Sequence, residues 1–222
     1  MSIPSHKSRP KKPRAVQAPQ RSNGKLRVAA ILEAAAAVIA EKGYEAATMA
    51  EIAARSGTKI GSLYRFFPNK ESLADTIVVS ARENLDVVFD EFDAKVNALS
   101  VQELADDLPA LLFEQVLNKP ALRKLLDANQ DWSVKREEFR IAVVRRIAKT
   151  LTIYNSDLPK KSAEDMALVI LANTKAMVTH QKLPDFAVRT LGEFRDMTRL
   201  YLQSRLGSSL SEKKDIPSWT SA

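Results

Sequence analysis

Apolar side chains recur along most of this chain at the spacing of three and four residues that gives a helix one apolar face. The first such stripe predicts a helix over residues 25–42, and its apolar members are Val28, Leu32, Ala35 and Ile39. Gly43 follows Lys42 directly, a pair that commonly closes a helix at its C-terminal end. No segment alternates convincingly between apolar and polar residues as a β-strand does. The pattern predicts an all-α protein.

Two short helices are predicted after this first one. Thr48 is followed three residues later by Glu51, which is the sequence of a capping box, so a helix is expected to start at Thr48 and to end near Gly57. The next helix covers roughly residues 60–66 and cannot continue through Pro68, because a proline excludes helical geometry at the preceding residue. Two short helices joined at a glycine after a longer helix form a helix-turn-helix pattern.

The remaining chain also carries helical stripes. Asn69 is a suitable N-cap for a fourth helix, which is expected to run to about Leu99. Further helices are predicted over residues 102–117, 121–129, 133–154, 161–181 and 186–206.

Composition narrows the possible chemistry of this chain. It has 222 residues, of which 45% are hydrophobic, and it contains no cysteine and two histidines. Disulfides, thiolate metal sites and cysteine nucleophiles are thereby excluded, and a multi-histidine metal site is disfavoured. The chain also has no nucleophilic-serine, zinc-protease, phosphate-loop or dinucleotide motif. We therefore expect neither an enzyme nor a bound metal or cofactor.

No apolar run approaches the roughly 18 residues that a membrane span requires. The first residues are charged and proline-rich, without the apolar core of a secretory signal. We expect a cytoplasmic protein that does not contact the membrane.

The formal net charge of +7 is concentrated at the start of the chain. Residues 1–25 hold seven of the 34 basic residues and no acidic one, so the other 27 basic residues are balanced by 27 acidic ones. A basic arm rich in proline and serine has too little apolar surface to fold, and it can neutralise DNA phosphates without sequence preference. Whether this arm assists DNA binding or only adds solubility stays open.

The residues of the predicted helix-turn-helix make that pattern much more specific. The run from Thr48 to Leu73 reads TMAEIAARSGTKIGSLYRFFPNKESL. It resembles the DNA-binding domain of the TetR (tetracycline repressor) family, which shows a Thr cap, Ile-Ala, a turn glycine, Gly-x-Leu-Tyr-x-aromatic-Phe and a lysine that opens the fourth helix. The resemblance covers about residues 25–75. The rest of the chain is similar to the family only in being helical and of typical length.

The resemblance implies a three-helix DNA-binding domain and a C-terminal helical domain for ligand binding and dimerisation. We accordingly divide the chain into a disordered basic arm, a helix-turn-helix domain, a sensing and dimerisation domain and a flexible tail. Their predicted bounds are 1–24, 25–72, 73–206 and 207–222.

A recognition helix lies in the major groove, where each base pair shows a distinct pattern of donors and acceptors. Gly61 permits a close approach to DNA, while Ser62 and Arg65 share one helix face and Arg65 can reach a guanine or a phosphate. Leu63 and Phe67 suit the opposite face and are expected to be core. The predicted DNA-binding residues are Thr48, Thr58, Lys59, Ile60, Gly61, Ser62, Tyr64, Arg65 and Lys70.

Three of these residues carry roles implied by the family. Tyr64 and Lys70 are similar to family residues that contact phosphate, and Thr48 can cap its helix and present the helix N-terminus to a phosphate. The alternatives are an ordinary helix edge for Tyr64, a solvated charge for Lys70 and a purely structural cap for Thr48.

This chain departs from the family at the start of the recognition helix. The family often has Val-Ser at the place of Thr58 and Lys59, and that serine usually caps the helix. A lysine side chain cannot accept a hydrogen bond, so either Thr58 takes over the cap or no side-chain cap exists. Ile60 is expected either to pack with the core residues or to touch a thymine methyl.

The C-terminal domain is expected to bind an unidentified small molecule and to pair two copies of the chain. The last two long helices, about 161–182 and 185–206, form the dimer interface in the family. Candidate ligand contacts are Phe113, Trp132, Asn173 and Met177, for each of which plain packing is the alternative.

The function that follows is a transcriptional repressor that binds a palindromic DNA operator as a homodimer and releases it on binding a small molecule. A constitutive regulator or an activator with a purely structural helical domain is the alternative. A helical enzyme is a remote one.

Overall fold

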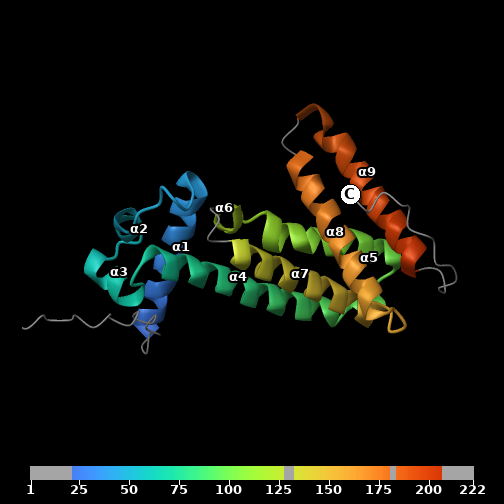
Figure 1. The fold of residues 1–222 in the computed structure, drawn as a ribbon, viewed down its shortest axis with the longest axis horizontal. Coiled ribbons are helices and arrows are strands. Elements are labelled where there is room, and N and C mark those ends of the chain that lie inside the picture. The colour runs from blue at the N-terminus through green and yellow to red at the C-terminus, as the bar shows by residue number, and fades with distance from the viewer. Residues whose placement is uncertain (1–21, 128–132, 181–183, 207–222) are drawn as a thin grey trace, which may run out of the picture. The chain divides into compact units, whose positions relative to one another are not determined.

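The computed structural model describes residues 22–127, 133–180 and 184–206, and all regular structure in these ranges is helical (Figure 1). The predicted all-α fold is therefore confirmed. The helices are α1 (Ser22–Lys42), α2 (Met49–Arg55), α3 (Ile60–Phe66), α4 (Lys70–Asp93), α5 (Val101–Leu112), α6 (Pro120–Asp127), α7 (Ser133–Tyr154), α8 (Lys160–His180) and α9 (Pro184–Leu206). None of these helices is long and apolar enough to cross a membrane.

The predicted start of the first helix and the predicted end of the fourth were wrong. Helix α1 begins at Ser22, so residues 22–24 are helical instead of belonging to the arm, and residues 1–21 lie outside the described residues. Helix α4 ends at Asp93 instead of Leu99, and a 3₁₀ turn over Val96–Ala98 follows it.

The early end of α4 has a local cause that the sequence contains. The Ser100 hydroxyl accepts a hydrogen bond from the Glu103 N–H at 3.2 Å, and a Glu103 carboxylate oxygen accepts one from the Ser100 N–H at 2.7 Å. This capping box starts α5 at Val101, so the chain must leave the preceding helix several residues earlier. The same bonds hold the pKa of the Glu103 carboxyl below its ordinary value.

Helix α5 does not run unbroken to Leu117 as predicted. It contains Pro109, which has no N–H to donate, and after Leu112 it continues as one π-helical turn over Phe113–Leu117. The Asn118 N–H donates to the Phe113 carbonyl at 2.7 Å and closes that wider turn. The other helices agree with the predicted ones to within a few residues.

The chain divides into two compact units that meet within α4, between Val79 and Ser80. The division expected from the sequence lay between residues 72 and 73. The first unit contains α1, α2, α3 and the start of α4. Its core consists of fully buried apolar side chains from all four helices, among them Ile31, Ile39, Ile52, Leu63, Phe67 and Leu73.

The second unit contains the rest of α4 and the helices from α5 onward. Within it α7 packs on α8, α5 packs on α9, and α8 and α9 run side by side as the orange and red ribbons of Figure 1. Its buried apolar residues recur at helical spacing and include Leu104, Leu108, Leu112, Leu125, Ile147, Leu151 and Met166.

A charged cluster holds the C-terminal half of α4 against α7 inside this second unit. The Arg146 guanidinium donates to Asp90 at 2.8 Å and to Asp93 at 3.2 Å, and it lies 5.4 Å from the centre of the Phe89 ring. The Thr150 hydroxyl donates to the other Asp93 oxygen at 2.6 Å. These bonds pair the charge of a largely buried guanidinium, which would otherwise be costly, although its Nε has no hydrogen-bond partner among the described residues.

Candidate nucleic-acid interface

The start of α2 is fixed by the capping box that the sequence predicts. The Thr48 hydroxyl accepts from the Glu51 N–H at 3.2 Å, and a Glu51 carboxylate oxygen accepts from the Thr48 N–H at 3.3 Å. Glu51 also forms an ion pair with Lys42 at the end of α1. The bond from Lys42, and then those from Thr48, hold the pKa of the Glu51 carboxyl below its ordinary value. Thr48 itself remains exposed.

The turn between α2 and α3 depends on Gly57. Its φ of +62° lies in the left-handed region, which residues with a Cβ rarely adopt. The Gly57 N–H donates to the Ala54 carbonyl at 3.2 Å, and the Thr58 N–H donates to the Ala53 carbonyl at 2.9 Å. These bonds terminate α2 and turn the chain towards α3.

Helix α3 begins without a side-chain cap. Lys59 occupies the N-cap position and its side chain makes no capping hydrogen bond. The Thr58 hydroxyl lies 3.5 Å from the Ser56 carbonyl and does not cap α3 either. Of the two possibilities left open by the sequence, the absent cap is the one observed. The side chains of Lys59 and Thr58 therefore take no part in capping α3.

The two faces of α3 differ sharply in exposure. Leu63 and Phe67 are 0% and 1% exposed, so their expected place in the core is confirmed, and Phe66 is buried beside them. On the opposite side Ile60 is 44% and Tyr64 is 49% exposed. Ile60 thus points away from the core. We call the exposed residues Lys59, Ile60, Gly61, Tyr64 and Arg65 the exposed face of α3.

The polar groups on the exposed face of α3 have few partners within the chain. Neither Lys59 nor Arg65 forms an ion pair with a carboxylate of the described residues, and the Tyr64 hydroxyl has no hydrogen-bond partner there. The Arg65 guanidinium only lies near the Phe66 ring, 5.3 Å from its centre. Ser62 is partly buried at the edge of this face. The face is positively charged and able to accept new contacts.

Lys70 is not the solvated charge that the sequence left open as an alternative. Its ammonium group donates to the carbonyls of Tyr44 and Glu45 at 2.8 and 2.9 Å and lies 4.5 Å from the centre of the Tyr44 ring. Two of its three N–H donors therefore tie the start of α4 to the loop after α1. The predicted cap of α4 is confirmed, since the Asn69 side-chain oxygen accepts from the Ser72 N–H at 2.7 Å.

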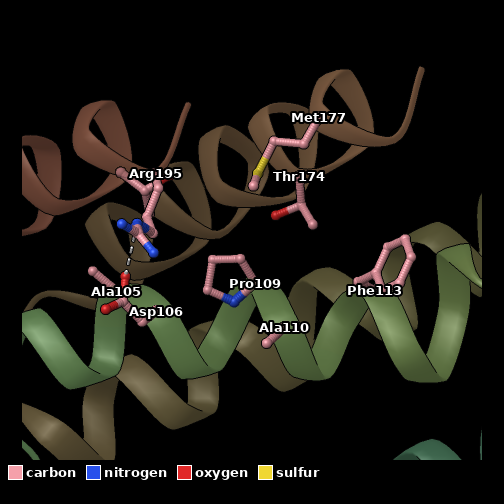
Figure 2. Close-up of a pocket in the computed structure, with 9 residues that line it drawn as sticks. Ala105, Asp106, Pro109, Ala110, Phe113, Thr174, Met177 and Arg195 are labelled. Atoms are coloured by element: carbon pink, nitrogen blue, oxygen red, sulfur yellow. Dashed lines mark ion pairs between the residues drawn. The ribbon is translucent and has the colours of Figure 1, made fainter. Parts of the chain in front are cut away.

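Among the predicted ligand contacts, Phe113 and Met177 line one cavity of about 170 Å³ between α5, α8 and α9 (Figure 2). Asn173 does not line it, because its amide donates to the Phe194 carbonyl at 3.0 Å and to the Thr198 hydroxyl at 2.5 Å and so joins α8 to α9. Trp132 lies outside the described residues.

The polar residues that line this cavity were not predicted from the sequence. Thr174 and Thr198 contribute hydroxyl groups, and Asp106 forms ion pairs with Arg199 and with Arg195, the latter marked by the dashed line in Figure 2. No sequence signal connects Asp106 to an arginine 93 residues later in the chain. The remaining lining is apolar, so the cavity suits a small molecule with few polar groups.

A buried face and an exposed basic face on the second helix of a helix-turn-helix define a DNA-binding protein of the helix-turn-helix class. The comparisons with known proteins agree. Residues 31–77 match the family model described as "Bacterial regulatory proteins, tetR family". The first part of the chain is therefore similar to the DNA-binding domain of the TetR family of transcriptional regulators.

Solved structures of similar fold span nearly the whole of their own chains. A putative TetR-family regulator from Mesorhizobium loti MAFF303099 matches with a TM-score of 0.63 at 19% identity, over 84% of this chain and 98% of that one. A TerR/AcrR-family regulator from Aquifex aeolicus VF5 matches with a TM-score of 0.60 at 20% identity, over 81% and 99%. FadR from Bacillus subtilis in complex with stearoyl-CoA matches with a TM-score of 0.55 at 19% identity, over 78% and 96%. At these identities the likeness shows the fold, and no curated protein matches the chain significantly.

Two glycines of this domain are expected to respond oppositely to alanine. Gly57→Ala should lower the free energy of unfolding by about 1 kcal/mol, because it places a Cβ at a left-handed φ. Gly61→Ala should not lower it, because Gly61 is helical, a Cβ there meets open space, and alanine favours helix over glycine. Urea unfolding of both variants, followed by circular dichroism, measures the difference. Equal destabilisation by the two substitutions would contradict this account of the turn.

Proposed function

We propose that this protein is a ligand-responsive repressor that binds a palindromic operator as a homodimer and releases it when a small molecule binds the second unit. The observation that carries the proposal is the pair of faces on α3: Leu63 and Phe67 are buried, while Ile60, Tyr64 and Arg65 are exposed. This arrangement supports insertion of α3 into the major groove with its polar and basic side chains towards DNA.

Each residue of the exposed face has a role suited to its chemistry. Arg65 forms a bidentate contact with guanine O6 and N7 or pairs with a phosphate, and Ile60 packs against a thymine methyl. The Tyr64 hydroxyl donates to a phosphate, and Lys59 adds a cation beside it. These contacts separate into those that set sequence preference, at Arg65 and Ile60, and those that set register on the backbone.

The remaining predicted contacts lie at the edges of this face. Ser62 reaches a base edge from its partly buried position, and Thr58 does so from the turn before α3. Lys70 keeps one N–H donor after its two bonds to carbonyls and can contact a phosphate. Thr48 is exposed at the start of α2, and its hydroxyl would exchange the hydrogen bond that it donates to Glu51 for one to a phosphate.

Gly61 supports close approach of DNA to the start of α3. Apart from the neighbouring residues and the backbone of α3 itself, no atom of the described residues lies within 4 Å of the place where its Cβ would be, and its φ is not positive. The fold therefore does not require a glycine there. Close approach of the α3 backbone to DNA does require a glycine at position 61, because a side chain there would hold the helix away from the groove.

A pair of chains is supported by apolar residues exposed on α8 and α9. Leu168, Val169, Met197 and Leu200 are between 41% and 66% exposed in the single chain. Exposed apolar residues gathered on neighbouring helices are typical of a protein–protein interface. A two-fold dimer through these helices presents two copies of α3, which explains why a palindromic operator is expected.

The cavity between α5, α8 and α9 is the proposed effector site. Phe113 and Met177 supply apolar walls, and the hydroxyl oxygen of Thr174, which donates its hydrogen to the Ile170 carbonyl, can accept a hydrogen bond from a ligand (Figure 2). The structure of FadR from Bacillus subtilis in complex with stearoyl-CoA supports the idea that a protein of this fold can respond to a small organic ligand.

Helix α4 offers a route from ligand to DNA, because it is continuous from Lys70 in the first unit to Asp93 in the second. A ligand shifts the equilibrium between DNA-binding and DNA-released states only as far as it binds one of them more tightly. The proposed ligand favours the released state, in which the two copies of α3 no longer match the spacing of the half-sites.

The DNA-reading role is tested by substituting the exposed face. Arg65→Ala should weaken operator binding by about ten- to a hundredfold, and Tyr64→Phe by about three- to tenfold, because they remove a charged contact and one hydrogen bond respectively. Gly61→Ala should weaken binding without loss of stability. Gel-shift titrations at several salt concentrations, on duplexes selected from a random pool, measure these effects.

The control is Arg145→Ala, which changes an exposed arginine of α7 and should bind as the parent does. Binding by an Arg65→Ala, Tyr64→Phe double variant as firm as that of the parent would refute the role of α3.

The dimer is tested with a charge placed on its expected interface. Leu200→Glu should convert the dimer to a monomer, because a carboxylate would be buried without a partner, whereas Val87→Glu on the exposed side of α4 should leave the dimer intact. Sedimentation equilibrium gives the mass of each variant. A Leu200→Glu protein that remains dimeric would place the interface elsewhere.

Ligand sensing is tested by a thermal-shift screen with small organic compounds on the full chain. A compound present at about a hundred times its dissociation constant should stabilise the protein by about 2.7 kcal/mol and should release the operator. Ala110→Trp partly fills the cavity and should abolish both effects while leaving operator binding intact. Operator binding that no stabilising compound disturbs would instead favour a constitutive regulator.

A further inference from the structure

The second unit contains another cavity, which the proposed function does not use. It measures about 290 Å³ and lies among α6, α7, α8 and the π-helical turn at Phe113–Leu117. It shares no lining residue with the cavity of Figure 2. Its volume is close to the lower end of the range that small-molecule sites occupy.

The floor of this second cavity is apolar. Five of its lining side chains are buried and Leu126 is partly buried, so an apolar body placed there would lose contact with water on most sides. The five buried residues are Val116, Leu117, Phe139, Val143 and Leu171.

The rim of the same cavity is charged and carries more cations than anions. Four basic side chains, contributed by three different helices, accompany two carboxylates, so the rim has an excess of two positive charges. The basic residues are Arg123 of α6, Arg136 and Arg140 of α7 and Lys175 of α8, and the acidic ones are Asp127 and Glu137.

One of the carboxylates is already engaged within the rim. Glu137 accepts two hydrogen bonds from Arg140, at 2.6 and 2.9 Å. Arg140, together with the nearby charge of Lys175, holds the pKa of Glu137 below its ordinary value, so this carboxyl is ionised at neutral pH. Arg136 forms no ion pair with any described residue, and Arg123 makes only one long bond of 3.5 Å, to the Leu117 carbonyl. Arg136 and Arg123 therefore have donors to spare at the cavity mouth.

Ordinary solvated surface charge does not account for this arrangement as a whole. Charged residues on a helix surface usually alternate in sign and lie over other polar groups, whereas here cations from three helices converge on one apolar hollow. A purely apolar ligand would leave these cations unused, and a small inorganic anion would leave the floor uncovered. A molecule with both parts matches both features.

We propose that this cavity binds an amphipathic monoanion, a compact apolar body that carries one carboxylate or sulfonate group. The body lies on the floor formed around Phe139 and Val143, and the anionic group lies at the mouth with Arg136 and Arg123. The binding itself does not depend on the proposed repressor function. Only an effect of the bound anion on operator binding would rest on that function.

The test compares two probes of nearly the same shape on the full chain without DNA. 1-Naphthaleneacetate is an anion, and 2-(1-naphthyl)ethanol is its neutral counterpart. Isothermal titration calorimetry should show the anion binding at least about tenfold more tightly, since a charge-assisted hydrogen bond is worth roughly a factor of ten or more. The advantage should shrink as the salt concentration rises. Equal affinity for the two probes would overturn the proposal.

Three variants locate the binding. Arg136→Gln should weaken the anion about tenfold and leave the neutral probe unchanged, while Arg145→Gln, the same change outside the cavity on the same helix, should alter neither. Leu126→Phe puts a larger side chain into the hollow and should weaken both probes. Circular dichroism confirms that each variant is folded. Equal effects of Arg136→Gln and Arg145→Gln, or unchanged binding by folded Leu126→Phe, would show that the anion binds elsewhere.

A gel shift with operator DNA separates this proposal from the repressor function. Loss of operator binding in the Arg65→Ala, Tyr64→Phe double variant, with anion binding unchanged, supports a site that is independent of DNA reading. A failed anion test together with normal operator binding would overturn the cavity proposal and leave the proposed function standing.

Discussion

Burial of Leu63 and Phe67 is the constraint on which the proposed DNA-reading surface depends, because it sets the rotation of α3 about its own axis. Once these two side chains lie in the core, helical periodicity places Ile60, Tyr64 and Arg65 on the other side. The left-handed turn at Gly57 limits the same helix at its start. A helix of seven residues thus acquires a single, defined outward face.

Helix α4 is held by a cation in each of the two units. Near its start Lys70 donates to the carbonyls of the loop after α1, and near its end Asp90 and Asp93 accept from Arg146 of α7. Both attachments are directional hydrogen bonds to a charged group, which are stronger than neutral ones. One continuous helix therefore has a specific contact in the first unit, which contains the proposed DNA-reading face, and another in the second unit, which contains the cavities.

The two cavities described in the second unit differ in chemistry and have only α8 in common among the α-helices that line them. In the cavity of Figure 2 the lining contains one carboxylate, Asp106, and one cation, Arg195, which pair with each other, and the hydroxyl groups of its two threonines already donate to helix carbonyls. In the second cavity the cations outnumber the carboxylates. The first suits a nearly neutral ligand and the second an anion, so the unit is suited to two classes of small molecule.

The sequence by itself determined the all-α class, the order of the helices, the capping box at Thr48 and the buried and exposed sides of α3. Each of these follows from interactions between residues a few positions apart, which periodicity and caps record directly. Even the early end of α4 follows from a local interaction, the capping box that Ser100 and Glu103 form at the start of α5. The tertiary structure alone decided that Lys70 binds two carbonyls, that Asn173 joins α8 to α9, and which residues line each cavity. Those facts depend on helices distant in sequence meeting at particular faces, and no local pattern carries that information.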